Sequence, residues 1–134
     1  MSNWTHVAGI IRIDSIRFLD GDIDFDKEIG KECLWDSDDE TWKEFEEYPE
    51  RFMPAGSEGT LRKVVWDNPN KSHMAAYTVS IFGDLRDHDD PDEIVEWFKD
   101  ICEKFMVRNA TITVYNELNG TRSWDYCVED EKEH

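Results

Sequence analysis

The sequence contains no long hydrophobic run, few cysteines, and no basic start followed by an apolar segment. A transmembrane helix needs about 18 or more largely apolar residues and a secretory signal needs that basic start, so we expect neither. The three cysteines, Cys33, Cys102 and Cys127, lack CxxC spacing, which favours buried free thiols in a reducing compartment over a disulfide framework. We therefore expect a cytoplasmic protein that does not bind a membrane.

Basic residues are also scarce. Fifteen Lys and Arg stand against 32 Asp and Glu, which gives a formal net charge of −17 at pH 7. Nucleic acids and anionic membranes are themselves negative, and a protein with this charge is repelled by both. We therefore expect no direct binding of DNA or RNA.

The sequence lacks signatures of catalysis and of metal binding. The four His are scattered and no Ser or Cys lies in a nucleophile elbow, so we expect no enzyme. Residues 20–26 have the alternating carboxylates of a calcium loop, but the glycine and the final glutamate of that loop are missing. Residues 87–89 offer adjacent Asp and His ligands of low specificity. We expect neither a metal nor another cofactor.

The sequence does contain enough apolar material for one core. Apolar residues make up 39% of the chain, and six Trp, seven Phe and four Tyr supply large side chains. No internal repeat or Gly/Ser linker divides the chain. We predict a single domain over residues 1–128, followed by an acidic tail over residues 129–134.

Alternating apolar residues predict the strands. Residues 5–18 are apolar on both faces, which is typical of a central strand. Residues 59–66 and 75–82 flank the turn-forming stretch 67–72, and they should form an antiparallel pair.

The last two strands are predicted from an Asn-Gly step at residues 119–120, which favours a two-residue type I′ turn between residues 108–118 and 121–128. Such a loop pairs Tyr115 with Trp124 across the two strands. It places three aromatic side chains on one face of the hairpin: Tyr115, Trp124 and Tyr126.

Capping residues and helical spacing predict the helices. Asp22 or Asp24 can cap a short helix in which Phe25, Ile29 and Cys33 recur every fourth residue, although Gly30 weakens it. A second helix over residues 39–48 ends at Pro49. The strongest helix begins at residues 90–91, where Asp is the N-cap and Pro takes the first helical position. Its apolar face consists of Ile94, Trp97, Phe98, Ile101 and Phe105.

The order of these segments is strand, helices, strand, strand, helix, strand and edge strand. This order predicts an α+β domain. It fits a ferredoxin-like βαββαβ antiparallel sheet, with helices on one face and an extra C-terminal edge strand.

Acidic residues are concentrated in the predicted helices. Residues 20–50 carry a net charge of −11 and residues 84–103 a net charge of −7. Helices on one face of a sheet would gather these carboxylates there. Two interpretations are open. The acid is either a solvated face that serves solubility, or a surface that mimics nucleic acid and occupies the basic groove of another protein.

In the second interpretation, the contacts to a basic nucleic-acid-binding protein are carboxylates of the two helical segments, with one Trp as an anchor. They are Asp36, Asp38, Asp39, Glu40, Trp42, Glu44, Glu46, Glu47, Asp92, Glu93 and Glu96. One alternative is a structural or assembly subunit that forms a homodimer or a partner contact through Tyr115, Trp124 and Tyr126. Another is a sponge for a small ligand such as a nucleotide.

The opening Trp-Thr-His-Val-Ala-Gly-Ile-Ile-Arg-Ile-Asp, residues 4–14, resembles the start of small proteins carried by phages of Gram-positive bacteria. In size, acidity and lack of catalytic motifs, the chain also resembles phage-encoded inhibitors of host defence, including anti-CRISPR and anti-restriction DNA mimics. The resemblance implies a non-enzymatic inhibitor that acts on a basic host protein in the host cytoplasm. It assigns no role to individual residues.

Overall fold

The structure is a computed structural model that describes residues 2–16, 23–34, 39–67 and 74–128. Its strands are β1 (Trp4–Ile16), β2 (Ala55–Gly56), β3 (Gly59–Thr60), β4 (Arg62–Asp67), β5 (Met74–Arg86), β6 (Met106–Asn116) and β7 (Gly120–Cys127). Its helices are α2 (Phe25–Glu28), α3 (Asp39–Glu47), the 3-10 turn η1 (Pro49–Arg51) and α4 (Pro91–Cys102).

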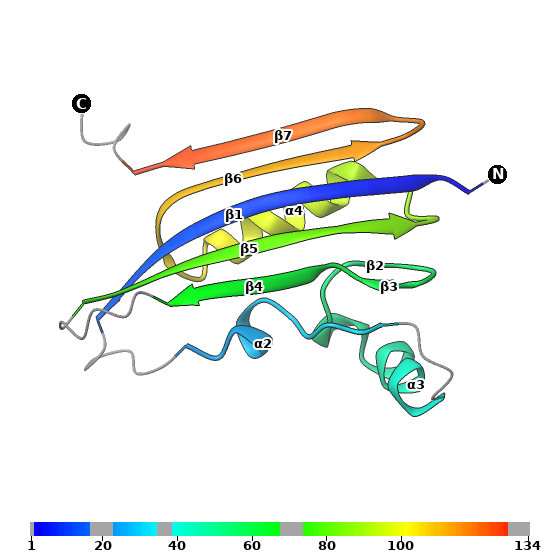
Figure 1. The fold of residues 1–134 in the computed structure, drawn as a ribbon, viewed down its shortest axis with the longest axis horizontal. Coiled ribbons are helices and arrows are strands. Elements are labelled where there is room, and N and C mark those ends of the chain that lie inside the picture. Colours follow the sequence, from blue (N-terminus) through cyan, green and yellow to red (C-terminus); the bar gives the residue numbers. More distant parts are fainter. Residues whose placement is uncertain (1, 17–22, 35–38, 68–73, 129–134) are drawn as a thin grey trace.

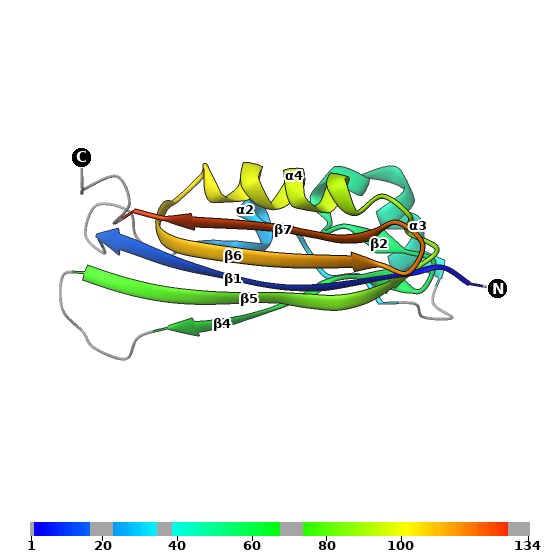
Figure 2. The same cartoon turned by 90° about the horizontal axis from the view of Figure 1, so that it is seen from above.

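The main sheet has five strands in the order β4-β5-β1-β6-β7 within the described residues, and all neighbours are antiparallel. The short strands β2 and β3 pair with each other in a separate sheet. Figure 1 shows β1 in the centre, as predicted. Figure 2 shows α2, α3 and α4 on the same side of the sheet. The predicted α+β architecture with an antiparallel sheet is therefore confirmed.

The core lies between the sheet and α4. Val7 and Ile11 of the central strand are buried on the side of the sheet that faces this helix. Between them lies Gly9, where a Cβ atom would be 3.0 Å from the ring of Phe98. The missing side chain allows Phe98, which is fully buried, to approach the strand closely. This contact fixes the position of α4 on the sheet.

Helix α4 begins where the sequence predicts. Asp90 is its N-cap, and the Asp90 carboxylate accepts a hydrogen bond from the backbone N–H of Glu93 at 3.2 Å. The proline that follows the N-cap takes the first helical position. Ile94, Phe98 and Ile101 are buried against the sheet. The predicted N-terminus is confirmed. The predicted apolar face is confirmed as far as Ile101, whereas Phe105 packs against the core from beyond the end of the helix at Cys102.

The connection from β1 to β4 is less regular than predicted. The helix capped by Asp24 is one turn long, and the chain then turns at Gly30, which has a φ of +127°. A Cβ atom at this glycine would lie 2.8 Å from the backbone nitrogen of Met53, so only glycine permits the close passage of the two segments. Beyond it, Lys31 forms a parallel β-bridge with Phe52. The predicted helical continuation past Gly30 is therefore wrong.

The register of the last hairpin also differs from the prediction. Strands β6 and β7 pair Asn116 with Gly120 and Tyr115 with Thr121, so the loop contains three residues. Gly120 has a φ of +86°, as in hairpins where a left-handed residue follows a three-residue loop. Trp124 therefore does not pair with Tyr115. The predicted two-residue turn and its register are wrong.

This shift separates the predicted aromatic cluster onto two faces. The Trp124 ring lies on the helix side of the sheet, 5.9 Å from the ring of Phe98, and Tyr126 stacks on Trp124. Tyr115 is exposed on the opposite side. Successive residues of a strand point to opposite faces, so an odd shift in register moves a whole set of side chains. The three rings do not form the common contact surface that was predicted.

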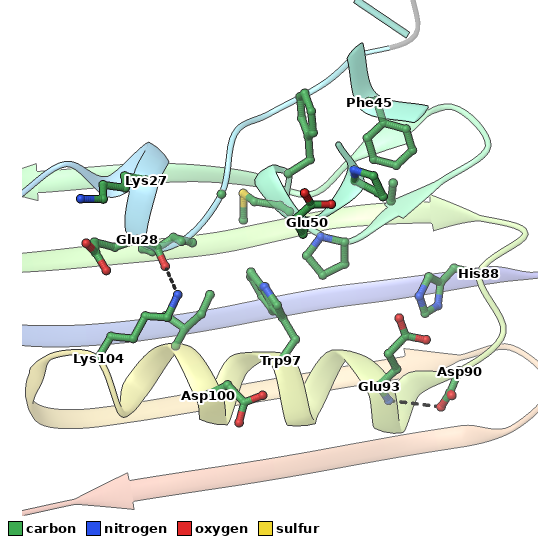
Figure 3. A pocket seen from close by; sticks show the side chains of 18 of the residues that line it. Lys27, Glu28, Phe45, Glu50, His88, Asp90, Glu93, Trp97, Asp100 and Lys104 are labelled. Carbon is green, nitrogen blue, oxygen red and sulfur yellow. Dashed lines mark hydrogen bonds between the residues drawn. The ribbon is translucent and has the colours of Figure 1, made fainter. Parts of the chain in front are cut away.

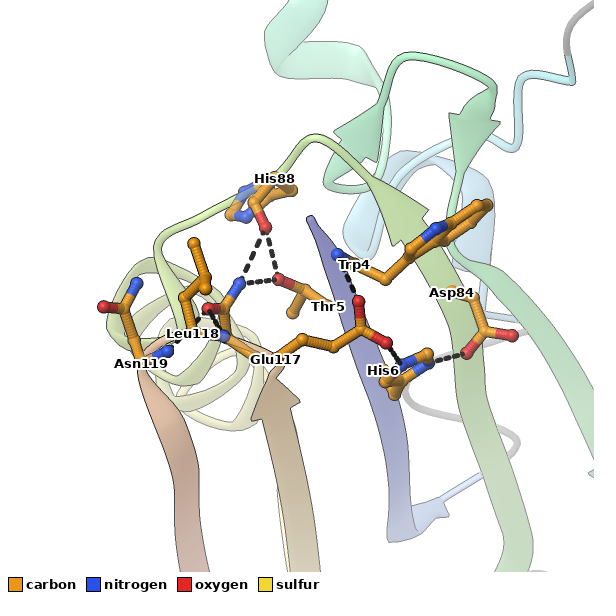
Figure 4. Close-up of polar contacts among 9 residues, drawn as sticks. Trp4, Thr5, His6, Asp84, His88, Glu117, Leu118 and Asn119 are labelled. Carbon is orange, nitrogen blue, oxygen red and sulfur yellow. Dashed lines mark hydrogen bonds and ion pairs between the residues drawn. The ribbon is translucent and has the colours of Figure 1, made fainter. Parts of the chain in front are cut away.

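The side chain of Asn116 explains the three-residue loop. This fully buried amide accepts hydrogen bonds at Oδ1 from the backbone N–H groups of Leu118 and Asn119, at 2.9 and 2.8 Å. Its Nδ2 atom donates to Thr5 Oγ1 at 2.8 Å and to the carbonyl of His88 at 3.2 Å. Figure 4 shows how these contacts join the loop to β1 and to the segment before α4. A buried amide needs such partners, and the three-residue loop supplies those of Oδ1.

Two of the three cysteines are buried as expected. Burial raises the pKa of both the Cys33 and the Cys102 thiols, that of Cys102 to about 12. Cys127 is only half-buried. None of the helices in the described part of the chain is long and apolar enough to cross a membrane.

The Asn116→Ala substitution should lower the free energy of unfolding by about 3 kcal/mol, because it leaves several buried polar groups without partners. Urea denaturation followed by tryptophan fluorescence would measure this loss. The control is Asn109→Ala, which removes a hydrogen bond from Arg12 at 2.7 Å that is exposed to solvent. Equal losses in the two variants would contradict the role given to Asn116.

Candidate functional site

A groove with a volume of about 810 Å³ runs along α4, between this helix and the chain that forms α2 and η1. Figure 3 shows Glu93, Trp97 and Asp100 on the α4 side, opposite Glu28 and Glu50. The two acidic segments of the sequence therefore form opposite walls of one groove.

The groove has an apolar floor. Buried side chains of Ile29, Phe52, Met53 and Ile101 line it, together with the half-buried Trp97. A partly exposed aromatic ring beside buried apolar side chains can accept the apolar portion of a ligand. The groove can therefore bind by more than charge.

Carboxylates dominate the rim of the groove. The acidic lining residues are Glu28, Glu50, Asp87, Asp89, Asp90, Glu93 and Asp100. The basic lining residues are Lys27 and Lys104. Charges of one sign in a cleft with apolar walls reinforce one another and raise the local concentration of ions of the opposite sign. The groove therefore attracts cations.

Five of these carboxylates are unpaired. Within the part of the chain that the structure describes, the side chains of five lining residues form no ion pair and accept no hydrogen bond: Glu28, Glu50, Asp89, Glu93 and Asp100. Their charge is not neutralised by a neighbouring cation of the same chain. It remains available to a cation of another molecule.

The other flank of α4 contrasts with the groove. Asp92 pairs with Arg122, whose Nε atom lies 3.0 Å from the Asp92 carboxylate. Glu96 pairs with Lys99 across one turn of the helix at 3.1 Å. Paired surface carboxylates contribute less field than unpaired ones, so the binding potential of α4 lies on its groove side.

Local backbone features build the two ends of the groove. At one end, Lys104 donates from Nζ to the backbone carbonyl of Glu28 at 2.9 Å and joins α4 to α2. At the other end, Asp87 has a φ of 62°, a left-handed conformation that Asp tolerates better than most residues. Its backbone N–H donates to the carbonyl of Asn3 at 2.7 Å. This turn directs the chain from β5 into the acidic residues that precede α4.

His88 lies at that second end of the groove. Its carbonyl accepts hydrogen bonds from Thr5 and Asn116, which hold the residue in place. Its ring atom Nδ1 is buried and has no hydrogen-bond partner among the described residues. The ring therefore keeps an unused hydrogen-bonding position in the lining of the groove.

The predicted contacts on α3 are not part of the groove. The Glu44 carboxylate lies 3.8 Å from Lys31 Nζ, and Glu46 and Glu47 are exposed outside the groove. The Trp42 ring stacks on Phe45, at 5.1 Å between centroids. Two more residues of α3 were predicted as partner contacts. Asp39 is the first residue of the helix, and Glu40 is exposed. Asp36 and Asp38 lie outside the described residues.

Of the predicted α4 contacts, only Glu93 lines the groove. The prediction missed Asp100 and Trp97 as partners of Glu93, although the spacing of four and seven residues places all three on one helical face. It also missed Glu50, which belongs to the acidic segment 20–50 but reaches the groove only through long-range packing that the sequence does not show. The sequence signal that did point to the groove was the concentration of acidic residues in two segments of the chain.

Of the metal ligands considered from the sequence, Asp24, Asp26 and Asp87 have other partners, and Asp20 and Asp22 lie outside the described residues. The Asp24 carboxylate accepts from the backbone N–H of Lys27 at 3.1 Å, and Asp26 pairs with Lys63 Nζ at 2.6 Å. Asp87 accepts from the hydroxyl of Ser57 at 3.2 Å. Among the described residues, no three His, Cys, Asp or Glu side chains are grouped to hold a metal ion.

A second polar cluster lies at the edge of the opposite sheet face. His6 contacts Asp84 through Nδ1 at 2.7 Å and Glu117 through Nε2 at 3.2 Å (Figure 4). Its ring stacks on Tyr115. Hydrogen bonds first to Asp84 and then to Glu117 raise the pKa of His6 above 6.5. Protonated His6 joins β1, β5 and the end of β6.

The contribution of His6 to stability should depend on pH. Folding raises the pKa of His6, so the stabilisation is complete below pH 6.5 and is lost as the pH rises through the pKa of the folded state. The unfolding free energies of the wild-type chain and His6→Gln should differ more at about pH 6 than at about pH 9. Denaturation at both values measures this. A difference that does not change with pH would refute the linkage.

Comparison with models of protein families, with curated proteins and with solved structures found no match to this chain. The arguments about function therefore rest on the groove: two acidic walls, an apolar floor with Trp97, and five unpaired carboxylates.

Proposed function

We propose that the chain is a non-enzymatic binding protein. Its acidic groove binds the basic, nucleic-acid-binding surface of another protein. The observation that carries the proposal is the meeting of two acidic segments, far apart in the sequence, on opposite walls of one groove. In the setting that the sequence resemblance implies, the partner is a host defence protein and the contact inhibits it by excluding nucleic acid.

The unpaired carboxylates give this contact its affinity and its salt dependence. A basic surface that meets Glu50, Glu93 and Asp100 gains opposite charges without displacing an ion pair of this chain. Such attraction also speeds encounter and weakens as salt rises. Nucleotides are poor candidates for the same groove, because their phosphates would face seven carboxylates.

The concave form of the groove narrows the proposed partner. A duplex is convex and enters concave basic grooves, whereas a groove with acidic walls fits a protruding basic element. The groove face of α4 from Glu93 to Ile101 extends for about two helical turns, which matches a short basic helix. The apolar floor suits a helix with apolar side chains on its inner face. The proposed target is therefore a protruding amphipathic basic segment that otherwise contacts nucleic acid.

Reversal of groove charges should abolish this binding. The variant Glu50→Lys/Asp100→Lys should recover at least about tenfold less nucleic-acid-binding protein than wild type in affinity capture from a bacterial lysate at low salt. High salt should reduce capture by the wild-type chain. Fluorescence anisotropy with a synthetic amphipathic peptide that carries Lys and Arg on its polar face would measure the affinity of each variant.

The matched control is Glu46→Lys/Glu103→Lys, which changes the net charge by the same amount at exposed positions outside the groove. It should retain most of the binding. If both double variants lost binding equally, net charge alone would explain the interaction and the groove would have no specific role.

We also propose that the main sheet is a ferredoxin-like sheet extended by β7. In support, the four strands occur in the chain in the order β1, β4, β5 and β6, with crossovers after β1 and after β5. Their order in the sheet is β4-β5-β1-β6. That order results when both crossovers of a βαββαβ chain lie on one face of the sheet. The departure is the first crossover, which contains α2, α3, η1 and the β2-β3 pair in place of one long helix.

If β7 is an addition to a four-stranded unit, its amides should exchange with solvent faster than those of β6, while β1, β5 and β6 open together. Hydrogen exchange followed by NMR would measure the protection of each strand. Protection of β7 equal to that of β1 would count against the proposal.

A further inference from the structure

The face of the main sheet opposite the helices is not covered by any described element of the chain (Figure 2). The strand registers place Val64, Ser80 and Ile10 side by side in one row across this face. They place Phe82 and Ala8 side by side in the next row. The two rows form the centre of a sheet face that has no layer packed on it.

Exposed apolar side chains gather on this face. Eight large apolar side chains are exposed among the described residues, and five of these project from the uncovered face: Val64, Trp66, Phe82, Met106 and Tyr115. Val64 is 58% exposed, Trp66 55% and Phe82 42%. Apolar patches of this kind on a folded chain usually mark interaction surfaces.

The uncovered face carries little net charge, in contrast to the groove side. Near its end, the Asp14 carboxylate is paired with Arg108 at 2.9 Å. In the two central rows the charged side chains are Arg62, on the edge strand β4, and Asp125, on the opposite edge strand β7. The two central rows therefore have balanced charge.

We propose that the uncovered sheet face binds a second copy of this chain. Each copy carries a net charge of −17, so two copies repel each other wherever carboxylates face one another. The uncovered face is the side on which two chains can meet without opposing their acidic grooves. A basic partner is drawn instead to the groove, and nucleic acid is repelled by the whole chain.

The size of the face fits this occupant. Five strands spaced about 4.8 Å apart and about ten residues long, at about 3.3 Å per residue, form a face of about 800 Å². Each partner in a protein interface of standard size contributes about this area. Two sheets can pack face to face with their side chains interdigitated.

The charges at the two edges favour a particular two-fold arrangement. An axis parallel to β1 and midway between the facing sheets places β4 of one copy over β7 of the other. Arg62 of each copy then lies over the strand that carries Asp125 in the other copy. Because a two-fold interface repeats every contact, the dimer gains this attraction twice. Arg62 has no ion pair among the described residues, so it is available for the contact.

Sedimentation velocity over a series of protein concentrations tests the proposal, at about 0.05 M and about 0.5 M salt. We expect a monomer–dimer equilibrium that strengthens as salt rises, because salt screens the repulsion between two acidic chains. Binding to a basic partner through the groove should respond to salt in the opposite direction. A monomer at all concentrations in both salts would leave the face to a different partner and overturn the proposal.

Phe82→Glu should weaken dimerisation at least about tenfold, because it places a charge at the centre of the apolar contact. The control Leu118→Glu makes a similar change at a side chain that is 79% exposed in the loop between β6 and β7. Circular dichroism and thermal melting would establish that both variants are folded. A dimer unchanged by Phe82→Glu would refute the assigned surface, and loss of groove binding in the same variant would show that the two surfaces are not independent.

A charge exchange tests the two-fold arrangement even if Phe82 is structurally sensitive. Arg62→Asp should weaken dimerisation about fivefold, and the combination with Asp125→Arg should restore it to within about twofold of wild type. Recovery in the double variant would support contact between the two edges. Dimerisation no stronger in the double variant than in Arg62→Asp alone would overturn this arrangement.

Discussion

The packing of Phe98 against the backbone at Gly9 is the contact on which the rest of the structure depends. A side chain at Gly9 would press on the ring, so the helix lies close to the central strand only because this position is glycine. The contact also fixes the rotation of α4 about its own axis. Ile94 and Ile101 then face the sheet, and the side of the helix that carries Glu93 is turned toward the groove wall that carries Glu50. An apolar contact thus determines where the acid is displayed.

Much of the fold could be predicted from the sequence where the signals are local. The cap at Asp90 and the alternation along β1 each involve residues close together in the chain, and both predictions were confirmed. The last hairpin could not be predicted in this way. Its Asn-Gly step favours a two-residue loop, but the buried amide of Asn116 is held by Thr5, 111 residues away. A long-range hydrogen bond therefore overrides a local turn preference and reverses the direction in which Trp124 projects.

The candidate site shows the same limit. The concentration of acid in two segments is visible in the sequence, but the choice of carboxylates that share a groove depends on how residues 23–34 and 39–51 pack beside α4. That path is set by the left-handed Gly30 and by the bridge from Lys31 to Phe52. Glu93 and Asp92 are neighbours in the sequence, yet one lines the groove and the other is held in an ion pair on the opposite flank.

The groove also differs from one end to the other, and this asymmetry has a consequence for anything bound in it. Lys27 and Lys104 bring positive charge to the end where α4 is joined to Glu28, whereas residues 87–90 gather carboxylates at the opposite end. A charged chain in the groove has one favoured polarity: its cationic portion rests beside residues 87–90 and its neutral or anionic portion beside the two lysines. The reversed orientation would set the cationic portion beside the two lysines and take it away from the carboxylates, so the electric field alone selects the direction in which a ligand enters.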